Sequence, residues 1–191
     1  HRDLHSFPTR RSSDLYPLKN STKGPDKQMQ KQPIVFDTTY LLPLFGFHVD
    51  LSSDFENQLE SIWAEGHPHF QIIVPSVGFI EVMYKFNSLY RSDPDAKKFN
   101  YIVESLPTIL QSPHITIFHA ETNLLATEMA IKIRTAGHSD LMDCYIAGTA
   151  FAVDGIYLTE EKTIQKVLKT IPDFNIKRIW NWSRFLQEIA I

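Results

Sequence analysis

The segment His138–Lys162 reads HSDLMDCYIAGTAFAVDGIYLTEEK. It predicts an apolar helix with Asp140 and Asp143 at its entrance, then a turn at Gly155, then a short apolar strand that ends at two glutamates. In open α/β sheets, ligands bind outside the carboxyl ends of the strands. Acids at a helix entrance and at a strand exit therefore indicate a functional site.

The remainder of the chain repeats this alternation of apolar strands and amphipathic helices. Strands are predicted at residues 33–36, 71–74, 115–118, 156–158 and 176–180. Helices are predicted at 55–66, 76–90, 94–110, 120–135 and 164–171, from 183 onward, and after Asp140. Strands that alternate with helices imply parallel pairing and right-handed crossovers. The predicted fold class is α/β, a three-layer α/β/α sandwich with a roughly five-stranded parallel sheet.

The helix predicted at residues 76–90 contains one acid within an otherwise apolar pattern. Its buried side is expected to consist of apolar residues at helical spacing. These are Phe79, Ile80, Met83, Tyr84 and Phe86. Glu81 falls about one turn into the helix, where an apolar residue would otherwise be expected. Glu81 is therefore a candidate functional residue.

Composition narrows the class of protein. The chain has 191 residues and 43% apolar content, which favours one folded domain with a sizeable core. It contains no apolar run of about 18 residues and its start is polar, so a cytoplasmic protein without a membrane span is expected. The single cysteine, Cys144, excludes an internal disulfide. We expect Cys144 to be a small buried core residue rather than a nucleophile.

The first 32 residues differ from the rest of the chain. HSFPTRRSSDL, at residues 5–15, resembles the translation of a common sequencing-adapter oligonucleotide, and the polar stretch after it lacks apolar periodicity. We therefore expect residues 1–32 to be a disordered or artefactual segment and residues 33–191 to form the domain. That domain contains 12 basic and 19 acidic residues. A domain this acidic either avoids polyanions or needs bound cations to approach them.

Acidic residues stand at four junctions between strands and helices. Asp37 ends the first strand, and Glu81 follows the second. Asp143 lies at the start of its helix, and Glu160 or Glu161 follows the end of the fourth strand. These junctions meet at one edge of a parallel sheet, where four carboxylates would repel one another unless cations held them. Oxygen ligands suit Mg²⁺ or Mn²⁺, which can activate water and screen a phosphodiester, so the acids point to hydrolytic phosphoryl chemistry.

Four motifs along the chain carry these acids: IVFDTT at residues 34–39, VPSVGFIEVMYKF at 74–86, DCYIAGTA at 143–150 and LTEE at 158–161. In this order they resemble the PIN domain family of metal-dependent ribonucleases, which includes the VapC-like toxin ribonucleases. The resemblance covers essentially all of residues 33–191. DCYIAGTA is the most specific motif, and the joint order of the four matters more than any one of them.

The resemblance implies a set of catalytic metal ligands. Asp37, Glu81 and Asp143 match ligand positions of the family, and Glu161 matches a fourth acid that is usually Asp. Glu161 is longer than Asp by one methylene group, and Glu160 beside it makes the register ambiguous. At this fourth position the chain departs from the family pattern, so the fourth ligand stays open.

Four residues near these acids are further candidates. Asp140 lies one helical turn before Asp143 and could replace the fourth acid, although we favour a role for it in capping the helix. The resemblance places Thr38 and Thr159 near the metal. His138 could contact a substrate phosphate, but we favour a residue of the helix-entry loop.

Some histidines and aromatic residues admit two interpretations. His67 and His69 could form a metal pair, but they lie in a Gly-Pro loop without a third ligand, so a surface loop is favoured. Four aromatic residues could stack nucleobases or pack in the core, and packing is favoured. These residues are Phe45, Phe47, Trp180 and Trp182.

The resemblance implies an endoribonuclease that uses Mg²⁺ or Mn²⁺ to hydrolyse RNA phosphodiester bonds and leaves 5′-phosphate ends. It also implies the toxin of a toxin–antitoxin pair, with a small antitoxin protein as partner and with homodimerisation. Two other classes stay open. One is a catalytically inactive PIN-like module that binds RNA or acts as a scaffold, and the other is a metal-dependent phosphatase.

Overall fold

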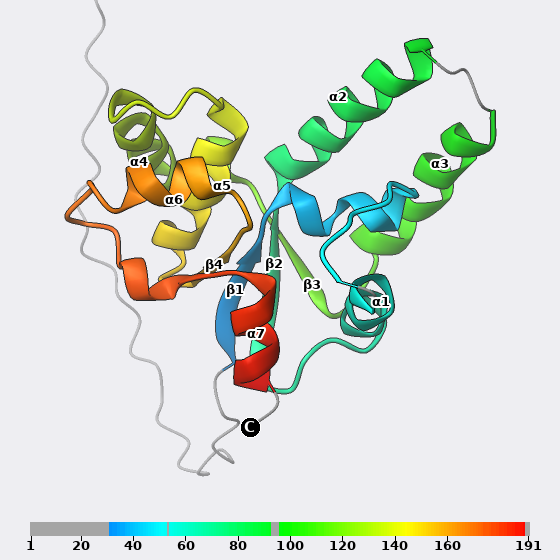
Figure 1. The fold of residues 1–191 in the computed structure, drawn as a ribbon, viewed down its shortest axis with the longest axis horizontal. Coiled ribbons are helices and arrows are strands. Elements are labelled where there is room, and N and C mark those ends of the chain that lie inside the picture. The colour runs from blue at the N-terminus through cyan, green and yellow to red at the C-terminus, as the bar shows by residue number, and fades with distance from the viewer. Residues whose placement is uncertain (1–30, 53, 93–95, 190–191) are drawn as a thin grey trace, which may run out of the picture.

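One parallel sheet of five strands forms the centre of the protein (Figure 1). The computed structural model describes residues 31–52, 54–92 and 96–189. The strands are β1 (Gln32–Phe36), β2 (Phe70–Pro75), β3 (Ile115–Phe118), β4 (Ile156–Leu158) and β5 (Ile179–Trp180). Their order is β3-β2-β1-β4-β5, and every neighbouring pair is parallel. The predicted α/β fold class with five parallel strands is confirmed.

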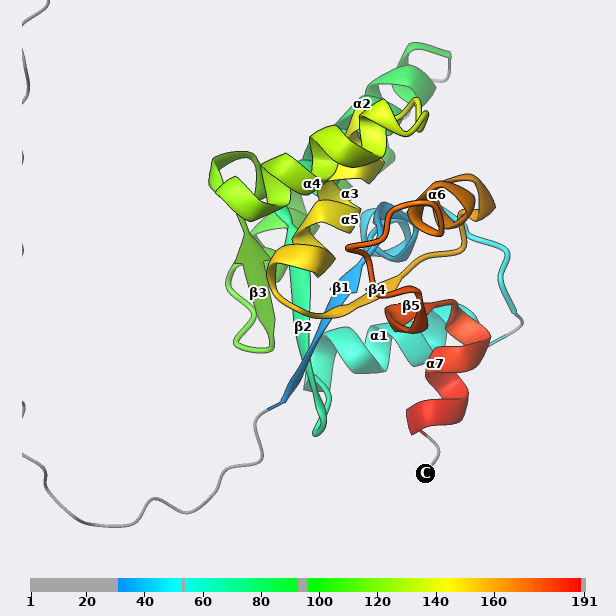
Figure 2. The same cartoon turned by 90° about the vertical axis from the view of Figure 1, so that its left-hand side faces the viewer.

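Seven α-helices of the described chain surround the sheet. They are α1 (Phe55–Glu65), α2 (Ser76–Ser92), α3 (Ala96–Leu110), α4 (Leu124–Thr135), α5 (Leu141–Ala152), α6 (Lys162–Leu168) and α7 (Trp182–Ile189). Helices α4, α5 and α6 cover one face, and α1 and α7 cover the other (Figures 1 and 2). Helix α2 projects beyond the carboxyl edge of the sheet, and α3 runs back toward the sheet (Figure 1). None of these described helices has the length and apolar character to cross a membrane.

Alternate residues of the central strands enter two separate apolar cores. Ile34 and Phe36 of β1 belong to the core beneath α1 and α7. Val35 of β1 and Tyr157 of β4 belong to the core beneath α4, α5 and α6. All four residues are fully buried, as expected for parallel strands that are covered on both faces. The two cores fix which face of the sheet each residue after the strands will occupy.

The predicted buried side of α2 is wrong in part. Ile80, Met83 and Tyr84 are exposed, whereas Val82 and Phe86 are buried. Apolar residues occur on two sides of this helix, so helical spacing alone does not show which side meets the core. Because α2 projects beyond the sheet, only one of its two apolar sides is covered.

The predicted strand at residues 176–180 is shorter in the structure. Ile176–Arg178 forms a 3₁₀ turn, and the side chain of Asn175 accepts a hydrogen bond from the backbone N–H of Lys177 at 3.1 Å. This local bond replaces strand pairing at the first three positions. The expectations for residues 1–30 and for the start of a helix at residue 94 lie outside the described residues.

Helices α4 and α5 pack closely because a glycine lies where they cross. A Cβ atom at Gly148 would come within 2.4 Å of the carbonyl oxygen of Ala126. The side chains of Asn123 and Asp140 cap the two helices by accepting hydrogen bonds from backbone N–H groups of the first turns, at 3.0 and 2.8 Å. The crossing and the caps together fix the entrance of α5, where Asp143 lies.

We expect Gly148→Ala to destabilise the fold by about 2–4 kcal/mol, because the added methyl group would overlap the backbone of α4. The higher helix propensity of Ala opposes this effect by only about 1 kcal/mol. Urea unfolding measures the change. As a control, Glu128→Ala on the exposed face of α4 should alter the free energy of unfolding by less than about 0.5 kcal/mol. Equal stability of Gly148→Ala and the wild type would contradict the close crossing.

Candidate functional site

The carboxyl ends of β1 and β4 border a cleft of about 790 Å³. The strands β2 and β3 extend the sheet on one side of β1, and β4 and β5 extend it on the other side. The edge between β1 and β4 is therefore the topological switch point, where open α/β sheets bind ligands. All the acids predicted as metal ligands line this cleft: Asp37, Glu81, Asp140, Asp143 and Glu161.

Asp37 is buried at the end of β1 and is held by hydrogen bonds to both carboxylate oxygens. Oδ1 accepts from the backbone N–H of Thr38 at 2.7 Å, and Oδ2 accepts from the hydroxyl of Thr159, after β4, at 2.6 Å. Burial raises the pKa of Asp37 to about 6. The charges of Glu81 and Glu161 add to this rise, and the two hydrogen bonds oppose it. Asp37 is thus oriented, but its charge is poorly stabilised.

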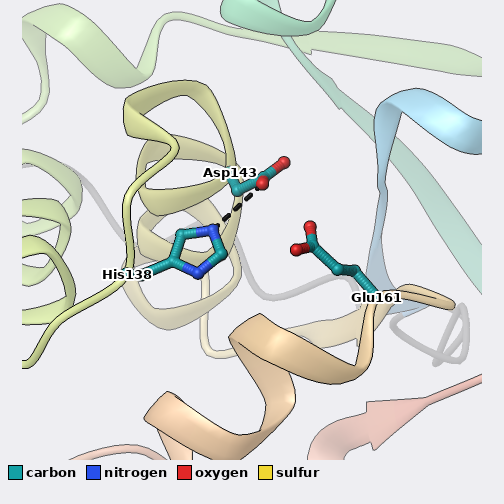
Figure 3. Close-up of side chains that lie close together, drawn as sticks. All are labelled: His138, Asp143 and Glu161. Atoms are coloured by element: carbon teal, nitrogen blue, oxygen red, sulfur yellow. Dashed lines mark hydrogen bonds and ion pairs between the residues drawn. The ribbon is translucent and has the colours of Figure 1, made fainter.

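Asp143, His138 and Glu161 form a compact group, here called the triangle (Figure 3). Asp143 lies in the first turn of α5, His138 lies in the loop before α5, and Glu161 directly precedes α6. Nε2 of His138 lies 3.0 Å from Oδ2 of Asp143. One ligand atom from each residue lies within 4.8 Å of the other two. Within the described ranges, the triangle is the one group of such side chains that is compact enough for a single ion.

The carboxyl groups of Asp143 and Glu161 point toward each other (Figure 3). Burial is the largest cause that raises the pKa of Asp143, to about 9, and hydrogen bonding with Glu161 is the next. The charge of Asp37 raises it further. Near neutral pH these effects favour the protonated form of Asp143. At neutral pH the triangle therefore holds a proton that a divalent cation would displace.

Glu81 projects from α2 into the same cleft, where it already has two partners. One carboxylate oxygen accepts from the hydroxyl of Thr38 at 2.7 Å, and the other lies 2.7 Å from Nζ of Lys85, one helical turn later. Because the backbone N–H of Thr38 binds Asp37, this residue connects Glu81 to Asp37. Glu81 shares the cleft with the triangle but does not belong to it.

The two glutamates after β4 both line the cleft but make different contacts. Oε1 of Glu160 accepts hydrogen bonds from the hydroxyl of Tyr40 at 2.9 Å and from the backbone N–H of Trp182 at 2.7 Å. Glu160 therefore joins the end of β4 to the start of α7. Glu161 is the acid that reaches Asp143, so the longer side chain does not keep it away from the cluster.

Asp140 and Cys144 have structural roles. The carboxylate of Asp140 accepts from the backbone N–H of Met142 at 2.8 Å, so the capping interpretation of Asp140 is confirmed. The thiol of Cys144 donates to the backbone carbonyl of Asp140 at 3.0 Å. Burial raises the pKa of this thiol to about 12. Cys144 is buried, as predicted. Its thiolate does not form near neutral pH, so it is not a nucleophile.

Two residues near the site have surroundings that the sequence did not predict. His138 is buried and contacts Asp143, rather than being only a residue of the helix-entry loop. Its position within the segment of the most specific motif was the available signal. The hydroxyl of Tyr157 is buried. Burial and then the charges of Asp37 and Asp143 raise its pKa, and hydrogen bonding with Thr159 opposes this rise.

The favoured interpretations of the aromatic residues and of the histidine loop agree with the structure. Phe45, Trp180 and Trp182 are buried in the core beneath α1 and α7, and Phe47 packs against that core. In the part of the chain that the structure describes, His67 and His69 belong to no compact group of three potential metal ligands.

The chemistry of the cleft fits a divalent cation. Asp37, Asp143 and Glu161 offer carboxylate oxygens, and His138 offers an imidazole nitrogen. The charges of neighbouring acids add to the raised pKa of Asp37 and of Asp143. A cation would relieve this repulsion, because it neutralises the acids.

We expect Asp143→Asn to stabilise the metal-free protein at pH 8 by about 1–3 kcal/mol. The folded-state pKa of Asp143 lies above its ordinary value of 3.8, so this residue lowers stability progressively as the pH rises from about 4 toward 9. Asn does not titrate, and the gain should shrink as the pH falls to about 5. Urea unfolding in the presence of a chelator at both pH values measures it.

The matched control is Asp140→Asn in the same helix turn. Asp140 is exposed, and Asn caps helices as well as Asp does, so this variant should change stability by less than about 0.5 kcal/mol at either pH. A gain for Asp143→Asn that is absent or independent of pH would contradict the raised pKa.

Comparison with known proteins places the chain in a family. The sequence model of the PIN domain matches residues 34–169. One similar solved structure is VapBC2 from Rickettsia felis, bound to a DNA fragment from its promoter. It has a TM-score of 0.51 at 19% identity, and the match covers 78% of this chain and 98% of the VapBC2 chain. FitAcB from Neisseria gonorrhoeae has a TM-score of 0.48 at 18% identity, and the match covers 78% of this chain and 95% of the FitAcB chain. A search of curated proteins finds no match. VapBC2 shares the fold, and the family match over most of the chain shows that the protein belongs to the PIN domain family.

Proposed function

We propose that the protein is an endoribonuclease that hydrolyses RNA phosphodiester bonds with Mg²⁺ or Mn²⁺ bound in the cleft. The observation that carries this proposal is the convergence of Asp37, Glu81, Asp143 and Glu161 in one cleft at the switch point of the sheet. These acids come from separate parts of the chain, so their convergence is not explained by the turn and cap preferences that place single acids at strand and helix ends.

The residues of the site prepare a cation-binding surface. Asp37 and Asp143 are the proposed central ligands, with Glu161 and Glu81 assisting. Hydrogen bonds from Thr38 and Thr159 fix the carboxylate of Asp37 before any ligand arrives. When bound, the cation would lower the pKa of a coordinated water and screen the charge of the phosphodiester.

Two lysines of the cleft offer contacts for the phosphate backbone. Lys85 and Lys166 line the cleft within an otherwise acidic surface. Lys85 is paired with Glu81 at 2.7 Å. When Glu81 binds a cation, this pairing weakens and the ammonium group of Lys85 becomes available to a phosphate. The lysines therefore offset part of the repulsion between RNA and an acidic domain.

The biological context that we propose is the toxin of a toxin–antitoxin pair that acts in the cytoplasm, with a small antitoxin protein as partner and with homodimerisation. The resemblance to VapC-like toxin ribonucleases and the shared fold with VapBC2 support this context. Coexpression with the product of an adjacent small reading frame tests it. A stable complex that suppresses ribonuclease activity is expected.

The nuclease proposal predicts metal-dependent cleavage of single-stranded RNA that stops in excess chelator. Asp37→Asn and Asp143→Asn should each lower kcat/KM by at least about 100-fold, since each removes a charged ligand. Gel analysis of end-labelled RNA measures the cleavage. Asp173→Asn, an exposed acid that pairs with Lys132, should retain wild-type activity.

Three results would oppose the nuclease proposal. Cleavage that persists in chelator would exclude metal dependence. Hydrolysis of a chromogenic phosphomonoester without RNA cleavage would indicate a phosphatase. RNA binding without cleavage would indicate an inactive module.

We expect Lys85→Met to weaken RNA binding about three- to tenfold, and to reduce the slope of log K against log[salt] by about one, because one phosphate contact is lost. Fluorescence anisotropy at several salt concentrations measures both quantities. The matched control is Lys132→Met, since Lys132 also pairs with a carboxylate at 2.7 Å but lies outside the cleft. Equal effects of the two variants would show that Lys85 has no specific role.

A further inference from the structure

His138 belongs to the triangle, yet the proposed reaction gives it no role. We propose that Nε2 of His138 is a metal ligand beside the carboxylates of Asp143 and Glu161, and that this nitrogen donor makes the centre prefer Mn²⁺ over Mg²⁺. The inference rests on the proposed function, because the same centre must bind a divalent cation. It goes beyond that function, because a set of oxygen ligands alone gives no reason for such a preference.

The spacing of the donor atoms fits one ion. Two ligands at right angles in a shell of about 2.1 Å radius lie about 3.0 Å apart, and two opposite ligands lie about 4.2 Å apart. Nε2 of His138 lies 3.0 Å from Oδ2 of Asp143, and no pair of donor atoms in the triangle is more than 4.8 Å apart. The three side chains therefore need only small movements to surround one ion.

The backbone holds His138 in place from both sides. Gly137 turns the chain after α4 with a φ of 108°, a conformation that L side chains rarely adopt. The N–H of His138 then donates to the carbonyl of Ile133 at 3.3 Å, and its carbonyl accepts from the guanidinium of Arg134 at 2.8 Å. The imidazole is 5% exposed and points at Asp143 (Figure 3). Such fixed orientation is expected of a ligand.

A nitrogen donor changes which ion the centre favours. Mg²⁺ binds oxygen ligands and retains much of its water, so an imidazole adds little to its affinity. Imidazole binds Fe²⁺, Ni²⁺ and Zn²⁺ best, and Mn²⁺ is the weakest of the first-row transition metals. Mn²⁺ is nevertheless the transition metal of the two ions in the proposed function, so its affinity gains more from the nitrogen of His138 than the affinity of Mg²⁺ does. Binding replaces the hydrogen bond between His138 and Asp143, and the proton of that bond passes to solvent.

Electron paramagnetic resonance of Mn²⁺ tests this ligand directly. The full chain, freed of metal and given one equivalent of Mn²⁺, should show the hyperfine coupling of a directly bound nitrogen in pulsed spectra. Incorporation of ¹⁵N-histidine should convert this signal to that of ¹⁵N. The wild-type measurement needs no variant, so it decides the ligand even if a substitution at His138 prevents folding.

The variants His138→Gln and His119→Gln complete the test. Gln retains a donor for Asp143, so His138→Gln separates metal ligation from hydrogen bonding. This variant should lose the nitrogen coupling and bind Mn²⁺ about tenfold more weakly by calorimetry, with less than about a threefold change for Mg²⁺. His119 also contacts a carboxylate, Glu121 at 3.3 Å, but it is exposed, so His119→Gln should leave both affinities unchanged.

The outcomes separate failure of this inference from failure of the proposed function. Mn²⁺ that binds without nitrogen coupling, in a protein that cleaves RNA, would overturn the inference and leave the function intact. Equal losses of Mn²⁺ and Mg²⁺ affinity in His138→Gln would also overturn it. Wild-type protein that binds neither ion would overturn both proposals.

Discussion

The burial of neighbouring carboxylates at the switch point of the sheet is the constraint on which the site depends. Burial is the largest cause of the raised pKa of both Asp37 and Asp143, so the surrounding protein disfavours their charged forms. Hydrogen bonds from Thr38 and Thr159 offset only part of this effect at Asp37. The two apolar cores, rather than the acids, therefore stabilise the fold, and the acids form a site whose mutual repulsion a bound cation would reduce.

The topology of the sheet brings these acids together from distant parts of the chain. Asp37 and Thr159 are 122 residues apart, yet they meet because β1 and β4 are neighbours whose last residues, Phe36 and Leu158, are paired. The cap of α5 and its crossing with α4 then fix Asp143 opposite them. Each acid thus lies on an element whose position is fixed by its own contacts. These contacts keep the acids together despite their mutual repulsion.

The sequence predicted the fold and the edge of the sheet at which the acids gather. It did not predict which side chains the acids contact. Short apolar strands alternating with helices left few topologies open, and acids that follow such strands necessarily gather at one edge. The buried side of α2 could not be predicted, because Met83 and Tyr84 are apolar on a helix that extends past the sheet. The contact of His138 with Asp143 depends on the turn at Gly137, whose direction no periodic pattern encodes.

The assignment of the two glutamates shows what the strand itself determines. Side chains alternate along β4, so Leu158 faces the core beneath α1 and α7, while Thr159 faces Asp37 on the other side. Glu160 continues the alternation and binds the start of α7 at Trp182. Glu161 then falls on the side of the cleft, where the chain is already turning into α6. Its extra methylene group lengthens its reach back to the acids of the cleft, so Glu in place of the usual Asp is compatible with a complete site.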